Sequence, residues 1–175
     1  MKFNGLYLIA FLMVFQFCSG NREKKVSETE IRETEEALIG ANRILVKKDR
    51  EKILSYVRRN NLTMKETPTG LWYSIERYGF GIKSQENALV TLKYTVSLLD
   101  STVCYDSDSL GVKQFRLGKG GVESGLEEGV LLLHVGDKAT FIMPPHLAHG
   151  LQGDGVKIPP RSIIIYNVIL LKVEP

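Results

Sequence analysis

Residues 90–98 read VTLKYTVSL, and this stretch decides the fold class. Apolar residues at every second position alternate with Thr, Lys and Ser. One face of an extended strand would therefore be buried and the other exposed to solvent. Residues 163–173 predict a second long strand, because β-branched side chains dominate both of its faces. We therefore expect a β-sheet in which both faces of residues 163–173 pack against other elements of the protein.

Three further strands and one short helix complete the expected domain. The strands lie at residues 71–75, 112–117 and 138–143, and Pro144 stops the last of them. Val122, Leu126 and Val130 recur at helical spacing and predict a short helix over residues 122–130. The strands are separated by turns without regular βαβ alternation, which predicts an α+β fold: an antiparallel sheet of about five strands wrapped around one short helix.

Length and charge narrow the class of protein. The 175 residues are 43% hydrophobic, enough for one sizeable core with an appendage. A net charge of +3, without a run of like charges, gives no electrostatic footprint for nucleic acid. We expect no nucleic-acid partner.

The first twenty residues have the build of a secretory signal. Lys2 precedes an apolar stretch from Leu6 to Phe17 that is too short to span a bilayer. Cys18 stands where a bacterial lipoprotein signal places its acylated cysteine. The alternatives are cleavage after Gly20 and, ranked last, a disulfide between Cys18 and Cys104. We expect an exported protein at the periplasmic face of the envelope, held in the outer membrane by a lipid if Cys18 is acylated.

A polar tether over residues 21–36 and a helical arm over residues 37–61 are expected to precede the domain at residues 69–174. Ser27 and Glu30 match a capping box, so the helix could also begin within the polar segment. Apolar residues in the arm recur at helical spacing. The arm either forms a homodimer or packs on its own domain, where it could cover the second face of residues 163–173.

Five segments resemble the FKBP-type peptidyl-prolyl isomerases in order and spacing. They read LKYTVSLLD, CYDSD, LGKGGVESGLEEGV, VGDKATFIMPP and IPPRSIIIYNVILLKV. The signal and the helical arm also resemble the lipoprotein members of this family that are associated with gliding motility in Bacteroidetes. The resemblance implies an FKBP-like fold over residues 90–173 and isomerisation of X-Pro bonds in exported proteins, without a metal or other cofactor.

The resemblance also implies the residues of the site. Catalytic roles would fall to Tyr94, Tyr105, Asp106, Phe115, His149 and Tyr166. Substrate would be bound by Val122, Leu126 and Ile158 and by the backbone N–H of Glu123. Taken singly, these aromatic residues are ordinary core residues, and Asp106 could simply form a turn at a strand end.

Three positions depart from the family pattern. Lys113 replaces a pocket aromatic, Leu126 replaces a tryptophan at the pocket floor, and His149 replaces a tyrosine. The first and third changes weaken the grip on substrate, so the alternative function is a non-catalytic peptide-binding chaperone or scaffold. His146 and His149 alone make a poor zinc site, because no third ligand accompanies them.

Overall fold

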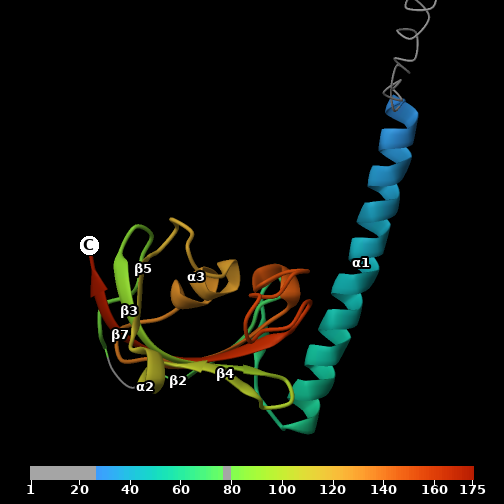
Figure 1. Cartoon of the computed structure of the whole chain (residues 1–175). Coiled ribbons are helices and arrows are strands. Elements are labelled where there is room, and N and C mark those ends of the chain that lie inside the picture. The colour runs from blue at the N-terminus through green and yellow to red at the C-terminus, as the bar shows by residue number, and fades with distance from the viewer. Residues whose placement is uncertain (1–26, 77–79) are drawn as a thin grey trace, which may run out of the picture. The chain divides into compact units, whose positions relative to one another are not determined.

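The computed structural model of the chain describes residues 27–76 and 80–175 (Figure 1). The chain divides into two compact units, residues 1–40 and 41–175. The expected signal segment, with Cys18 and Gly20, lies outside the described residues. None of the helices within the described ranges is long and apolar enough to cross a membrane.

Helix α1 (Glu28–Arg59) begins earlier than the expected Ala37. The Ser27 N–H donates to the Glu30 carboxylate at 2.9 Å, and the Glu30 N–H donates to the Ser27 hydroxyl oxygen at 3.2 Å. This reciprocal capping box satisfies N–H groups that a helix start leaves unpaired. Residues 28–36 are therefore helical, and the expectation of a polar tether through residue 36 is wrong for them.

The helix ends where the sequence predicts, next to Asn60 and Asn61. Asn61 adopts a left-handed conformation with φ of 51°, which asparagine tolerates. The Leu62 N–H then donates to the Val57 carbonyl at 3.0 Å, as in a Schellman motif. This turn directs the chain out of α1 and toward the first strand.

Seven antiparallel strands form one sheet with the order β1-β2-β6-β7-β3-β4, and β5 also pairs with β3. Their bounds are β1 (Lys65–Glu66), β2 (Trp72–Glu76), β3 (Leu89–Leu98), β4 (Val103–Asp106), β5 (Lys113–Arg116), β6 (Lys138–Met143) and β7 (Ile164–Glu174). The short helices are α2 (Ser107–Leu110), α3 (Ser124–Val130) and the 3-10 helix η1 (Pro145–Leu147). The predicted α+β fold is confirmed, with β1 and β4 added to the five expected strands.

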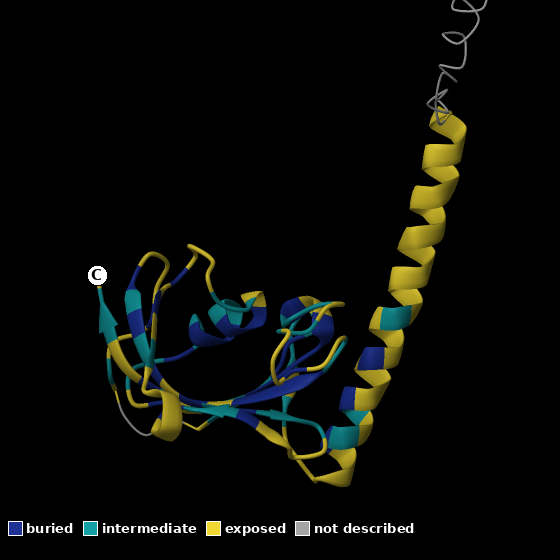
Figure 2. Cartoon of the chain, viewed as in Figure 1, coloured by how far each residue is buried: buried dark blue, intermediate teal, exposed yellow. Residues whose placement is uncertain are grey.

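The main core lies between the curved sheet and α3 (Figures 1 and 2). Along β3 the buried residues alternate with more exposed ones, as the pattern of residues 90–98 predicts. Gly129 lets α3 approach β6 closely, because a Cβ added there would lie 2.7 Å from the Phe141 ring. Leu126 and Val130 of α3 are fully buried in the same cluster.

A second, smaller core lies on the opposite face of the sheet. Ile53 and Val57 of α1 pack there with Trp72, Ile142, Ile163 and Ile165. Arg161, in the loop before β7, donates to the buried Asp49 carboxylate of α1 at 2.6 Å. The helix thus covers the first part of residues 163–173, whereas Leu171 near their end is 44% exposed.

We predict that Gly129→Ala destabilises the domain by about 1–3 kcal/mol, the usual cost of an added group in a packed core. Phe141 is fully buried and cannot move aside freely. The change is measured by urea unfolding, followed by far-ultraviolet circular dichroism and by the fluorescence of Trp72, the single tryptophan.

Gly40→Ala is the matched control. Gly40 also lies within a helix, but nothing approaches its added Cβ within 4 Å. Alanine there should raise helix content, since glycine costs up to about 1 kcal/mol in a helix interior. Equal stability of the Gly129→Ala variant and the wild type would contradict the tight contact of α3 with β6.

Candidate functional site

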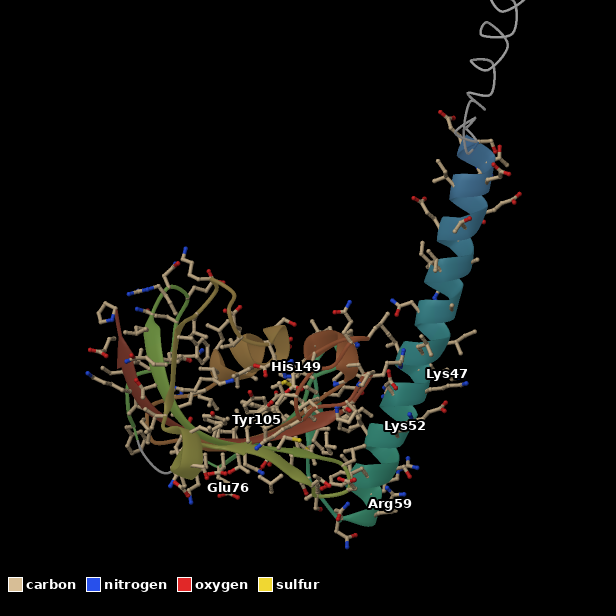
Figure 3. The ribbon with its side chains drawn as sticks, in the orientation of Figure 1. Lys47, Lys52, Arg59, Glu76, Tyr105 and His149 are labelled. Carbon is tan, nitrogen blue, oxygen red and sulfur yellow. The ribbon has the colours of Figure 1, made fainter. Side chains whose placement is uncertain are left out.

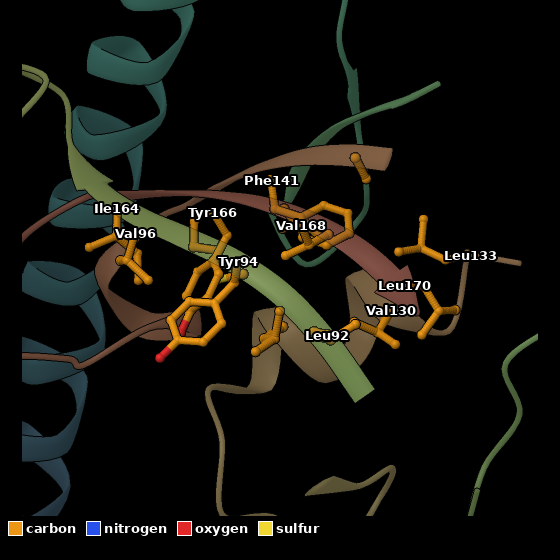
Figure 4. Packing of buried hydrophobic residues seen from close by; sticks show 14 of the residues in the cluster. Leu92, Tyr94, Val96, Val130, Leu133, Phe141, Ile164, Tyr166, Val168 and Leu170 are labelled. Carbon is orange, nitrogen blue, oxygen red and sulfur yellow. The ribbon is translucent and has the colours of Figure 1, made fainter. Parts of the chain in front are cut away.

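Two aromatic rings from neighbouring strands meet on the face of the sheet that carries the main core. Tyr94 on β3 and Tyr166 on β7 have ring centroids 6.1 Å apart and planes tilted by 39°. The strands pair with Tyr94 opposite Val168 and Val96 opposite Tyr166, so the two rings are diagonal neighbours. Figure 4 shows them side by side, at the opposite end of the cluster from Leu133 and Leu170.

Other apolar residues that the resemblance assigns to the site lie in the same core cluster as these rings. Leu126 of α3 is fully buried, and Phe115 of β5 and Ile158 of the loop before β7 are nearly so. Val122, just before α3, is half-buried against the same cluster. Phe115 pairs with Val90, four residues along β3 from Tyr94, so it lies away from the two rings. All of these residues serve as core or pack against it, and their role in binding stays a prediction.

Tyr105 on β4 donates its hydroxyl hydrogen to Asp154, a residue that the sequence did not single out. The same carboxylate accepts the N–H groups of Val156, Lys157 and Ile158 at 2.8–2.9 Å. Burial alone would raise the pKa of Asp154, but these hydrogen bonds outweigh it and hold the pKa well below its usual range. Asp154 thus folds the loop that presents Ile158 and fixes Tyr105.

Asp106 serves as the N-cap of α2. Its carboxylate accepts the N–H groups of Asp108 and Ser109, both at 2.9 Å. The Ser109 N–H, together with weaker contacts, lowers the pKa of Asp106. The Asp106 carboxylate therefore stabilises the turn at the end of β4, which was the alternative interpretation of this residue. The catalytic role of Asp106 stays a prediction.

A chain of hydrogen bonds joins the two unusual residues of the pocket through Glu123. Lys113 donates to the Tyr166 hydroxyl at 2.8 Å, and that hydroxyl donates to Glu123 Oε1 at 2.9 Å. His149 Nε2 lies 3.0 Å from the same oxygen, and Lys113 Nζ lies 3.8 Å from Oε2. Burial, and then the negative charge of Glu123, raise the pKa of Tyr166 far above its usual value, which keeps its hydroxyl protonated.

Sequence reasoning missed the side chain of Glu123 and assigned a role to its backbone alone. The Glu123 side chain is only 8% exposed, and its Oε2 accepts no hydrogen bond from any described residue. The available signal was the pair Lys113 and His149, two polar residues at positions where the resemblance leads us to expect aromatic side chains. A buried carboxylate needs such partners.

The backbone of Glu123 is placed as the resemblance requires. Its φ of −60° and ψ of 136° are extended, and the residue directly precedes α3. Among residues 27–76 and 80–175, none accepts a hydrogen bond from its N–H. This donor is available for a peptide carbonyl.

The two neighbouring histidines have different partners. His146 Nε2 lies 2.9 Å from the Thr69 carbonyl oxygen, whereas His149 faces Glu123. Figure 3 locates His149 and Tyr105 within the domain. His149 therefore contacts the Glu123 carboxylate, and His146 contacts the segment before β2.

Comparisons with known proteins identify the family. Residues 81–171 match the model of the FKBP-type peptidyl-prolyl cis-trans isomerases. The chain belongs to this family. FkpA of Neisseria meningitidis, a probable FKBP-type isomerase, is 36% identical over 131 residues, which cover 73% of this chain and 47% of the relative. Fkbp12 of Drosophila melanogaster, a peptidyl-prolyl cis-trans isomerase, is 44% identical over 87 residues, which cover 49% and 80% of the two chains.

Solved structures support the FKBP fold. The crystal structure of FkpA from Escherichia coli matches with a TM-score of 0.64 and 29% identity, covering 86% of this chain and 75% of that one. The chain spans about half the length of the curated FkpA relatives, 47% in Neisseria meningitidis and 41% in Aeromonas hydrophila. The match to the FKBP family model begins after β2, so α1, β1 and β2 lie before it.

We predict that Asp154→Asn loosens the pocket loop in a pH-dependent way. Because the folded pKa of Asp154 lies below the unfolded one, its charge stabilises the fold above about pH 4, and this contribution is lost as pH falls toward the folded pKa. The variant should have a lower urea midpoint than the wild type at neutral pH, and the gap should narrow in acid.

Asp108→Asn is the control for this experiment, because the Asp108 side chain is 77% exposed and pairs with the exposed Lys93. Its midpoint should stay close to that of the wild type. A gap for Asp154→Asn that is constant between neutral and acid pH would contradict the role of the ionised carboxylate.

Proposed function

We propose that this chain binds extended, proline-containing peptide segments and catalyses cis-trans isomerisation of their X-Pro bonds. The observation that carries the proposal is the pair of Tyr94 and Tyr166 rings, with the Tyr166 hydroxyl bonded to Glu123, a residue whose N–H donates to no described residue. Membership of the FKBP family supports the same activity.

Isomerisation requires no nucleophile. The barrier of about 18–20 kcal/mol arises because the C–N bond has partial double-bond character. A pocket that holds the proline ring among apolar side chains favours the twisted amide, whose carbonyl is less polar than that of the planar one. The Glu123 N–H would hold the flanking chain in an extended form while the bond turns.

Exposed apolar residues in the pocket segments support binding of a longer peptide. Leu110 and Val112 stand just before Lys113 and are 61% and 54% exposed. Leu151 and Val156, in the loop that follows His149, are 68% and 81% exposed. Such side chains can contact the residues that flank the proline in an unfolded client.

The alternative function is peptide binding without turnover. It is favoured by the Lys113 ammonium, which lies 5.2 Å from the centroid of the Tyr94 ring, 5.3 Å from that of Tyr166 and 2.8 Å from the Tyr166 hydroxyl. A proline ring would have to share this place with a cation. The two functions differ only in whether cis-trans isomerisation of the bound X-Pro bond is faster than that of the free peptide in water.

A protease-free assay of a proline tetrapeptide tests the proposal. The protein should accelerate the cis-to-trans relaxation, and Tyr166→Ala should lower kcat/KM by at least about tenfold, because it removes the ring and opens the pocket. Ile44→Ala, at an exposed position of α1, should keep the wild-type rate.

Circular dichroism must first show that the Tyr166→Ala variant is folded. Relaxation at the uncatalysed rate in the presence of wild-type protein would rule out catalysis. Suppressed aggregation of an unfolded client under the same conditions would then favour the binding function.

We further propose that the protein is exported, acts on exported clients and is held in the outer membrane by a lipid on Cys18, in keeping with its resemblance to gliding-motility lipoproteins. The supporting pattern is Lys2 followed by the apolar stretch and Cys18. The mass of the mature N-terminal peptide tests this: an acylated Cys18 supports the anchor, and an unmodified terminus after Gly20 contradicts it.

The exposed apolar residues of α1 support a proposal of homodimerisation. Ile31, Leu38, Ile39 and Ile44 are 47–65% exposed, which is unusual for large apolar side chains on a helix. Sedimentation equilibrium should give twice the chain mass, and Leu38→Glu should shift it toward the monomer. A wild-type chain that sediments as a monomer would contradict the proposal.

A further inference from the structure

The site holds charged groups of both signs. Lys113 and His149 face Glu123, and the Lys157 charge acts on Asp106, while Asp154 accepts the Lys157 backbone N–H, so two lysines accompany three carboxylates. Net charge therefore cannot decide which ligand the pocket prefers. Selectivity depends on which of these groups a ligand can reach.

The acids are already engaged by the protein. Glu123 is 8% exposed and its Oε1 faces both Tyr166 and His149. Asp106 accepts the N–H groups that begin α2, and Asp154 accepts three loop N–H groups and the Tyr105 hydroxyl. Glu123 Oε2 accepts no hydrogen bond from a described residue, but it is buried and lies 3.8 Å from the Lys113 ammonium, so a cationic ligand would compete with that ammonium for it.

The bases are the groups that a ligand can reach. The side chains of Lys113 and His149 are 25% and 26% exposed, about three times as much as that of Glu123. Lys113 makes one hydrogen bond among the described residues, to Tyr166, and an ammonium carries three donors. Lys157 is exposed and lies over the Tyr105 ring, with its Nζ 5.2 Å from the centroid.

We infer that the pocket selects X-Pro segments in which an acidic residue, Glu or Asp, stands next to the proline. This inference rests on the proposed function and names its substrate class. A peptide carboxylate at the pocket mouth would meet the free donors of Lys113, whose ammonium already lies beside the two tyrosine rings. Lys113 is then a specificity-determining residue, and its ion pair with Glu123 holds the ammonium in place.

The test compares tetrapeptides that differ only in the residue X before proline, with X as Glu, Gln, Leu or Lys. Glu and Gln have nearly the same shape, so their ratio isolates the charge. The wild-type protein should favour Glu over Gln by about three- to tenfold in kcat/KM, the size of one partly exposed ion pair. Lys should be the poorest, and high salt should reduce the preference because ions screen the pair.

Lys113→Met removes the charge and keeps most of the apolar stem. It should bring the ratio of Glu to Gln close to one. Lys52→Met is the matched control, because Lys52 is an exposed lysine on α1 (Figure 3), and it should keep the wild-type ratio. The salt dependence of the wild-type protein gives a second readout that requires no variant to fold.

Dissociation constants for the same peptides separate the two possible failures. Turnover of all peptides with a Glu-to-Gln ratio near one overturns the inference and leaves the isomerase function standing. Absence of turnover with tighter binding of the Glu peptide overturns catalysis and supports the inference. A preference for Lys over Gln overturns the inference, because it shows that ligands reach a carboxylate of the site rather than Lys113.

Discussion

The close approach of α3 to β6 is the constraint on which the site depends. Because Gly129 presents no side chain to the Phe141 ring, α3 approaches the sheet closely, and Leu126 is buried in the same core cluster as the two tyrosine rings. The same placement fixes the residue that precedes the helix. Glu123 therefore points its carboxylate among Lys113, Tyr166 and His149 and leaves its N–H free, so one packing contact positions both the apolar and the polar parts of the pocket.

The polar part behaves as a single unit. A carboxylate that is mostly removed from water is costly unless charged or hydrogen-bonding partners surround it. Lys113 and His149 are such partners, and Tyr166 links the first of them to the acid. Lys113 and His149 stand where the resemblance leads us to expect aromatic side chains, and in this chain both face the Glu123 carboxylate.

The sequence predicted the parts of the fold that depend on periodicity. The alternation in β3, the mixed apolar run in β7 and the stripe of Leu126 and Val130 each mark a buried face, and each was found. The helix was expected over residues 122–130, but α3 begins at Ser124, so Val122 precedes it and is only half-buried. Strand β1 was missed because two residues show no period, and β4 was missed because its segment, Val103–Asp106, ends in a turn-forming aspartate. The Glu123 network could not be predicted, because its members are brought together only when β5, β7 and the two loops fold. Asp154 was missed for a related reason, since its role depends on the local turn of the backbone.

The ion pair between Asp49 and Arg161 makes the second half of α1 part of the same structural unit as the sheet. Arg161 follows the Ile158-Pro159-Pro160 segment, and Asp49 belongs to a helix outside the match to the family model. A truncation at the family boundary would leave the Arg161 guanidinium without its counterion, and it would remove Ile53, Val57 and Trp72 from the face of Ile142, Ile163 and Ile165. The stable unit of the chain therefore begins inside α1, whose last turns cover one face of the sheet and anchor the loop before β7.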